Sequence, residues 1–310
     1  MLTRIAVIGL CLVSTSAVAG QRVVETSEKP DLEGRLVPAH EVVVETTRAP
    51  AGTQTTREVF AFDLDRRRRL VEVVESVRET LANGDTSTVH TTWAPDVNGR
   101  RAVLSRQVEQ ARSLTSDVHQ TETILLAPHL GDALRETERS FREERRISTG
   151  VIGHESTYSI RDVNGRWQPI ETRRGEAREI GAAERIDEET VQRLDVNGKL
   201  VDDERTVTRS FSENAREHAV IETFARSGGR LVLSQRVHRT TTARPDGGRD
   251  TVEEVEERNP VAPGDPLRVT RRIVTTVRRV TGGWVTEQEV FERDVNGRLL
   301  LVDRALTTSS

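Results

Sequence analysis

The chain has 310 residues, with 46 basic and 50 acidic side chains, a net charge of −4 and one cysteine. This weakly acidic balance argues against a general nucleic-acid binder, which carries a basic footprint. Aromatic residues at 3% and charged residues at 31% weigh against an outer-membrane barrel, which needs aromatic girdles and a lipid-facing apolar band.

Residues 1–19 have the pattern of a secretory signal peptide. Arg4 precedes an apolar run over 5–13, and Ala17 and Ala19 form a small-x-small cleavage pattern. The run is shorter than the ~20 residues of a spanning helix. Cys11 lies inside the run, so cleavage is favoured over an uncleaved anchor or a lipoprotein. We expect a mature domain over 20–310 that is periplasmic, on the cell surface or secreted, and not membrane-spanning.

One five-residue motif recurs through the mature domain. Asp-Val-Asn-Gly-Arg begins at Asp96, Asp162 and Asp294, and a copy with Lys in the last place begins at Asp195. The intervals between successive copies are 66, 33 and 99 residues, all multiples of 33. A fixed period of this length is typical of a repeat protein.

Asn-Gly between β-prone runs is a strong hairpin signal, because a type I′ loop needs positive φ at both central residues. The predicted structural turns are therefore at Asn98, Gly99, Asn164, Gly165, Asn197, Gly198, Asn296 and Gly297. A calcium loop would need an oxygen ligand where the motif has Arg or Lys. We expect no metal and no cofactor.

Residues 291–299, FERDVNGRL, resemble the turn of RHS or YD-type repeats, whose pattern runs YDxxGRL in secreted and surface shell proteins. The resemblance covers about six residues per copy, and the tyrosine of that pattern is absent. It implies long antiparallel hairpins in an extracellular β-structure, and it carries over no catalytic or binding residue.

A second turn signal follows most first turns by about 20 residues, which gives strands of about 12 residues that run alternately up and down. Two stretches, 132–146 and 175–194, are rich in helix formers but lack a sustained helical stripe, so we expect strands there too. The predicted fold is all-β: an antiparallel up-and-down meander of ~33-residue β-hairpin repeats that forms one long, twisted or curled sheet.

Treating the last two turns as two-residue loops makes Arg278 face Glu287 and Phe291 face Val302. In this register apolar side chains gather near one row of turns. They form a possible apolar binding band at Phe60, Trp93, Val290 and Phe291.

Zinc-helix spacing, a nucleophile elbow, a phosphate loop and a dinucleotide fingerprint are all missing from the sequence, so we expect no enzyme. The favoured hypothesis is a non-enzymatic repeat protein, a structural scaffold or a binding surface for an unknown protein or envelope polymer. The alternative is a carrier whose curled sheet encloses a lipid or another hydrophobic ligand. The sequence leaves the oligomeric state open.

Overall fold

The computed structural model describes residues 20–309, apart from 32, 50–51, 64, 97, 130–132, 182, 214 and 260–263. The predicted signal peptide lies outside the described residues. The described chain forms 18 strands: β1 (Gln21–Pro30), β2 (Leu36–Ala49), β3 (Gly52–Phe62), β4 (Arg68–Thr80), β5 (Thr86–Pro95), β6 (Arg101–Thr115), β7 (Val118–Pro128), β8 (Leu134–Ser148), β9 (Val151–Arg161), β10 (Trp167–Glu179), β11 (Glu184–Leu194), β12 (Leu200–Glu213), β13 (Arg216–Ser227), β14 (Arg230–Ala243), β15 (Arg249–Glu257), β16 (Arg268–Val280), β17 (Gly283–Arg293) and β18 (Leu299–Ser309).

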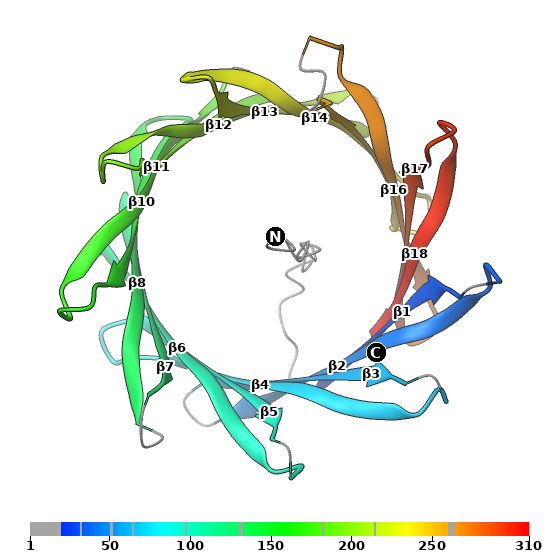
Figure 1. The fold of residues 1–310 in the computed structure, drawn as a ribbon, viewed down its shortest axis with the longest axis horizontal. Helices are drawn as coiled ribbons and strands as arrows, with labels where there is room; N and C mark the ends of the chain where they lie inside the picture. Colours follow the sequence, from blue (N-terminus) through cyan, green and yellow to red (C-terminus); the bar gives the residue numbers. More distant parts are fainter. Residues whose placement is uncertain are drawn as a thin grey trace.

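The sheet closes on itself. Each strand pairs antiparallel with the next one along the chain, and β1 also pairs with β18, from Val23 opposite Ser309 to Glu28 opposite Arg304. Figure 1 shows the resulting ring of strands, viewed along the barrel. Closure leaves no strand edge unpaired. The predicted open sheet is therefore wrong, because the structure is a closed 18-stranded antiparallel barrel.

The DVNGR motif makes a five-residue turn rather than the predicted type I′ loop. At 162–166 the Gly165 N–H donates to the Asp162 carbonyl at 2.9 Å, and the Asp162 N–H donates to the Arg166 carbonyl at 2.9 Å. Gly165 has φ 77°, whereas Asn164 is not among the residues with positive φ. This is a type I turn followed by a glycine in the left-handed region. The Asp162 carboxylate caps it by accepting the backbone N–H groups of Asn164 and Arg166.

Replacing Gly165 with Val should destabilise the barrel by about 1–2 kcal/mol, because a β-branched residue resists positive φ. A Cβ added there meets no atom within 4 Å, so the cost is conformational and not a clash. Gly181→Val is the control, since Gly181 is equally open and has no positive φ. Urea unfolding should separate the two variants, and equal stabilities would contradict the turn geometry.

The strand registers differ from prediction by small shifts. Arg278 lies opposite Val285 and not Glu287, because the β16–β17 loop is centred on residues 281–282. Phe291 lies opposite Leu301 and not Val302, because a bulge shifts the register between Val290 and Phe291. Similar shifts occur near the turn end of many hairpins, and each increases the local twist of the strands.

The two stretches rich in helix formers form strands over most of their described length. Residues 134–148 form β8, 175–179 lie in β10 and 184–194 form β11, while Ile180, Gly181 and Ala183 lie in the turn between β10 and β11. This prediction is confirmed. Pairing with neighbours on both sides overrides helix propensity in these stretches.

Stereochemistry assigns each side chain to the inside or the outside of the barrel. At the DVNGR turns the Asp backbone N–H and C=O both face the following strand. Consider a viewer who faces the sheet with the turn at the top and sees the following strand on the right. For an L-residue, the Asp side chain then points toward this viewer. Successive strands run clockwise in Figure 1 with these turns toward the viewer, so the face with the Asp side chains is the inner one. Residues an even number before the Asp therefore point inward, and those an odd number before it point outward.

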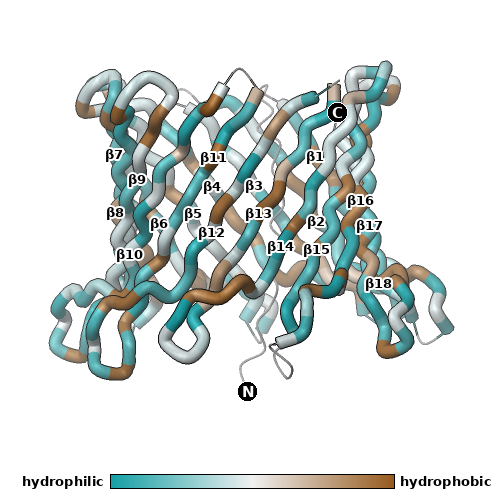
Figure 2. The backbone as a smooth tube through the Cα atoms, turned by 90° about the horizontal axis from the view of Figure 1, so that it is seen from above, coloured by the Kyte–Doolittle hydropathy of each residue, from teal (hydrophilic) through white to brown (hydrophobic). Residues whose placement is uncertain are grey.

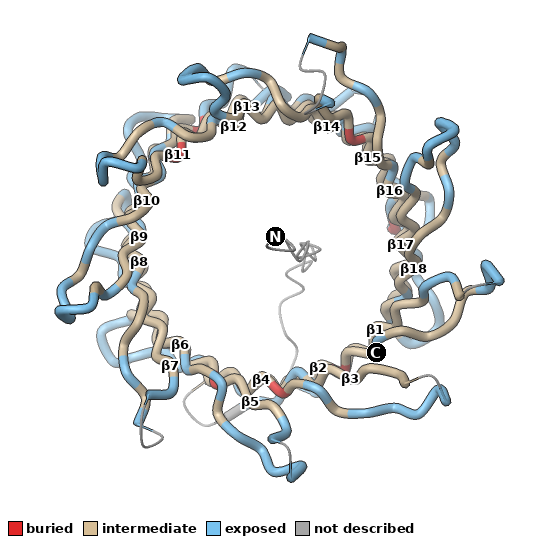
Figure 3. Tube along the Cα trace, viewed as in Figure 1, coloured by how far each residue is buried: buried red, intermediate tan, exposed pale blue. Residues whose placement is uncertain are grey.

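The barrel has little fully buried volume. Val73 and Val191 are the largest side chains with under 2% exposure among the described residues. Figure 3 shows intermediate burial along the strands and exposed turns at the ends. Side chains pack against neighbours on the same sheet, and most of the wall stays accessible from both faces.

Candidate functional site: the inner wall of the barrel

The inner wall is polar. Small hydroxyl and aliphatic side chains dominate several of its strands, and β5 is an example, with inward-facing Thr86, Thr88, His90, Thr92 and Ala94. His90 lies 2.6 Å from the Ser76 hydroxyl on the neighbouring strand. A barrel of 18 strands is too wide for its own side chains to fill the interior.

A charged sector interrupts this wall on β9, β10 and β11. The His154 Nε2 lies 3.0 Å from Glu189, which also accepts from Arg173 at 3.4 Å. Arg173 donates to Glu171 at 2.7 Å, and Glu171 accepts from Arg193 at 2.8 Å. All five side chains point inward by the alternation rule. We call them the luminal charge network.

The luminal network alternates in sign along its length, so its charges neutralise one another. Arg173 and Arg193 have side chains 44% and 40% exposed, so both guanidinium groups are accessible from the lumen. Partly exposed pairs contribute modestly to stability. Their larger effect is on the electrostatic potential inside the barrel, because charges on one concave wall act together.

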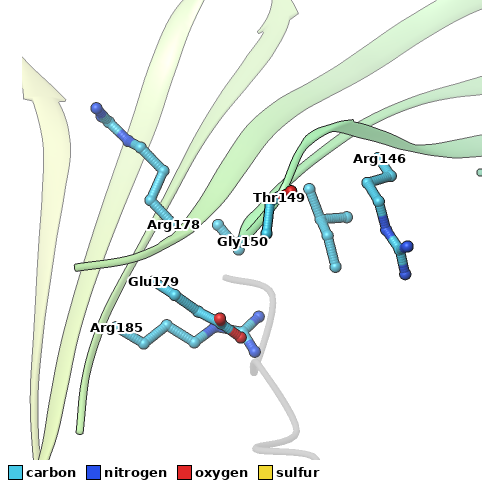
Figure 4. Close-up of a pocket in the computed structure, with 8 residues that line it drawn as sticks. Arg146, Thr149, Gly150, Arg178, Glu179 and Arg185 are labelled. Carbon is cyan, nitrogen blue, oxygen red and sulfur yellow. The ribbon is translucent and has the colours of Figure 1, made fainter. Parts of the chain in front are cut away.

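A shallow pocket of about 340 Å³ lies at the end of the barrel opposite the DVNGR turns, around the Thr149-Gly150 turn. Figure 4 shows Glu179 and Arg185 alongside each other on one side of it, with Arg146 on the other side. Arg146 lies 3.7 Å from Asp117, so it already has an acidic neighbour. The pocket is part of the polar inner wall.

The outer face has two different zones. Aromatic side chains point outward near the DVNGR turns: Phe60, Trp93, Trp167, Phe224 and Phe291. We call these the outer aromatic ring, and Figure 2 shows apolar segments gathered toward this flared end. Farther from the turns the outer face carries paired charges. Glu222 accepts from Arg236 at 2.8 Å and from Arg209 at 3.3 Å, and Arg236 lies 3.7 Å from Glu256.

The structure divides the predicted apolar band between the two faces. Phe60, Trp93 and Phe291 each precede a turn Asp by three residues and point outward. Val290 precedes Asp294 by four residues and points inward. The four do not form one ligand-binding surface. The luminal network was not singled out from the sequence, because its members are brought together only by the pairing of β9, β10 and β11.

Asp195, in the turn after β11, has a lowered pKa in the folded chain. Backbone hydrogen bonds from Lys199, and then from Asn197, lower the pKa of Asp195 below its usual value. A carboxylate with a lowered pKa in the folded state stabilises the turn above its unfolded pKa, and this contribution is lost as the pH falls through the folded pKa. An NMR titration of the Lys199 amide should show a midpoint below the usual Asp range. A midpoint at or above that range would contradict the cap.

No metal site is formed by the described residues, in which no three His, Cys, Asp or Glu side chains converge on one point. Nor does the described part of the chain contain a helix long and apolar enough to cross a membrane.

Solved structures with a similar fold include bacterial barrels. OpdL of Pseudomonas aeruginosa aligns with a TM-score of 0.58 and 9% identity, over 94% of this chain and 98% of that one. OccAB4 of Acinetobacter baumannii aligns with 0.55 and 7%, over 93% and 96%. A mutant Rh. blastica porin aligns with 0.53 and 9%, over 94% and 99%. No family model and no curated protein matches the sequence.

These findings correct several expectations. The resemblance to RHS or YD-type repeats is wrong, since the fold is that of porin-type barrels. The expectation that the chain does not span a membrane is contradicted by the closed 18-strand barrel. The same finding contradicts the hypotheses of a soluble scaffold and of a lipid carrier. The likeness to a porin agrees with the prediction of a non-enzymatic protein and with an extracytoplasmic location.

Proposed function

We propose that the chain forms a porin-like channel in a bacterial outer membrane, through which small polar solutes cross in water. The observation that carries this proposal is the pairing of β1 with β18, which closes an 18-stranded barrel. Barrels of 16–18 strands enclose an aqueous passage, and the hydroxyl-rich inner wall suits hydrated solutes. A signal peptide over residues 1–19, cleaved to leave a mature chain over 20–310, would supply the route of export.

The outer aromatic ring supports a membrane location. Transmembrane barrels carry aromatic girdles where the wall meets the lipid headgroups. The aromatic side chains are few in this chain, but Phe60, Trp93 and Phe291 all point outward near one end.

The outer ion pairs depart from the usual lipid-facing surface. Transmembrane barrels present an apolar band about 25 Å tall. Here the outer face carries ion pairs on several strands: Glu222 with its two arginines, Arg205 with Glu188, and Arg304 with Glu287. Each charge has a partner, which lowers the cost of removing it from water, although burial of ion pairs still opposes insertion.

The test is ion conductance across a planar lipid bilayer after addition of the detergent-purified chain. We expect discrete, long-lived conductance steps. The control is a chain that ends at Arg298 and so lacks β18, since it cannot close the barrel and should give no steps. A full-length chain with the circular-dichroism spectrum of a β-protein, but without conductance, would contradict the proposed function.

A further inference from the structure

The DVNGR turns carry a fully exposed apolar residue at their tips. Val163, Val196 and Val295 have exposures of 102%, 101% and 102%, as high as a side chain can reach. A single exposed valine would need no explanation. Here the same position recurs in the sequence of further turns, after Asp or His, as Leu32, Leu64, Val97 and Leu130.

A cation stands close to each of these valines. The last residue of the turn is Arg166, Lys199 or Arg298, and no acidic side chain within the described ranges forms an ion pair with any of them. The acid of the motif is occupied, since the carboxylate of Asp195 accepts the backbone N–H groups of Asn197 and Lys199. Each turn therefore presents an apolar tip and a free cation while its carboxylate is bound to its own backbone.

The hairpins that bear these turns bend away from the barrel axis. Figures 1 and 2 show them flaring outward at one end of the barrel. The outer aromatic ring lies directly behind them on the strands, with Phe291 three residues before Asp294. Tips, cations and aromatic side chains therefore share one rim, which we call the DVNGR rim after its three fully described turns at 162–166, 195–199 and 294–298.

The opposite rim differs at its turn tips. Three of its described turns have polar or acidic tips, at Asn83, Asp117 and Asp246. Asp246 accepts the Gly248 N–H, and Arg244 lies beside it. Exposed apolar side chains also lie beside the described turns of that rim, at Leu81, Ile180 and Val280, but their exposures of 43%, 55% and 40% are well below those of the DVNGR tips.

We propose that the DVNGR rim lies in the headgroup region of an anionic lipid bilayer, with the valines at the headgroup boundary and the neighbouring cations on lipid phosphates. Apolar side chains beside Lys or Arg are the chemistry of interfacial membrane anchors, and each cation near an anionic surface adds to the attraction. The proposal rests on the proposed channel function, to which it adds the turns of one rim as binding sites for anionic headgroups.

Site-specific fluorescence tests the tips. In a Cys11→Ser background, Val163→Cys, Val196→Cys and Val295→Cys each receive an environment-sensitive dye, with Asn83→Cys as the opposite-rim control. On addition of phosphatidylglycerol vesicles we expect blue-shifted emission from the three tip positions and a smaller shift at residue 83. A concentration-dependent blue shift without lipid would instead identify an interface between copies of the chain and overturn the proposal.

Charge removal tests the cations. The variant R166Q/K199Q/R298Q should bind phosphatidylglycerol vesicles on the order of 100-fold more weakly, since each cation near the surface contributes roughly 1 kcal/mol. R216Q/R249Q/R278Q removes three exposed cations from strand segments at the opposite rim and should bind nearly as the parent does. Equal losses in both variants would overturn the assignment of the rim.

Conductance of the same labelled chains separates the two proposals. If the chains conduct ions but the dyes at all three tips keep the emission they show in water, the channel proposal is supported and the lipid-facing rim is contradicted. If the dye emission at the tips is blue-shifted but the chains do not conduct, the membrane contact of the rim is supported and the channel proposal is contradicted.

Discussion

The double variant R173Q/R193Q should shift the channel toward cation selectivity by several-fold. Both guanidinium groups belong to the luminal charge network, in which they neutralise Glu171 and Glu189. Arg193 also donates to Asp203 at 2.5 Å. Removal of both cations leaves these carboxylates uncompensated on the inner wall, where like charges raise the local concentration of counter-ions. The reversal potential in a KCl gradient measures the shift.

The matched control is R209Q/R236Q. It removes the same number of arginines from the neighbourhood of an acid, Glu222, but on the outer face. We expect its reversal potential to stay near that of the parent, because outer charges are separated from the lumen by the barrel wall. An equal shift in both variants would show that the assignment of inner and outer faces is wrong.

Glu222→Ala should lower the free energy of unfolding by about 1–3 kcal/mol. Its side chain is only 16% exposed, and its two oxygens accept from Arg209 and Arg236. Truncation leaves two guanidinium groups side by side without their shared acid, which adds repulsion to the lost hydrogen bonds. Urea unfolding in detergent measures the change.

Glu45→Ala is the control for this prediction. Glu45 pairs with Arg22 on the same outer face at 3.1 Å, but both side chains are 59% exposed. Exposed pairs are screened by solvent, so the expected loss is below about 1 kcal/mol. If the two variants lose equal stability, the outer belt around Glu222 is no more than a set of solvated charges.

Much of the strand pattern could be predicted from the sequence. The turn positions follow from the DVNGR spacing, and 134–148 is a strand despite its helix-forming composition. The turn type was wrong for an identifiable reason. Asp at the first position of the motif favours a type I turn, because its carboxylate accepts backbone N–H groups within the turn. Gly99 then takes the positive φ of 75°, and Asn98 does not.

Closure could not be read from local patterns. The β1–β18 pairing joins residues such as Val23 and Ser309, and no short-range signal marks two terminal strands as partners. The low aromatic content was read as evidence against a membrane barrel. Composition alone does not show that Phe60, Trp93 and Phe291 share one face, although their common offset of three residues from the turn Asp is visible in the sequence.

The luminal charge network could not be found from the sequence either. His154 and Glu189 are 35 residues apart and meet only because β10 lies between their strands, with Gly175 leaving room for the imidazole ring. An added Cβ at Gly175 would lie 2.4 Å from that ring. Acidic and basic residues are so frequent in this chain that spacing alone selects none of them.

Disulfide formation between β1 and β18 tests the closed barrel most directly. Ser27 and Ala305 are paired on the inner face in the closing register. In a Cys11→Ser background, S27C/A305C should oxidise rapidly to an intramolecular disulfide and keep its conductance, while S27C/S76C, whose cysteines lie on β1 and β4, should not. Failure of S27C/A305C to form an intramolecular disulfide in the folded chain would contradict the closed barrel, and with it the channel.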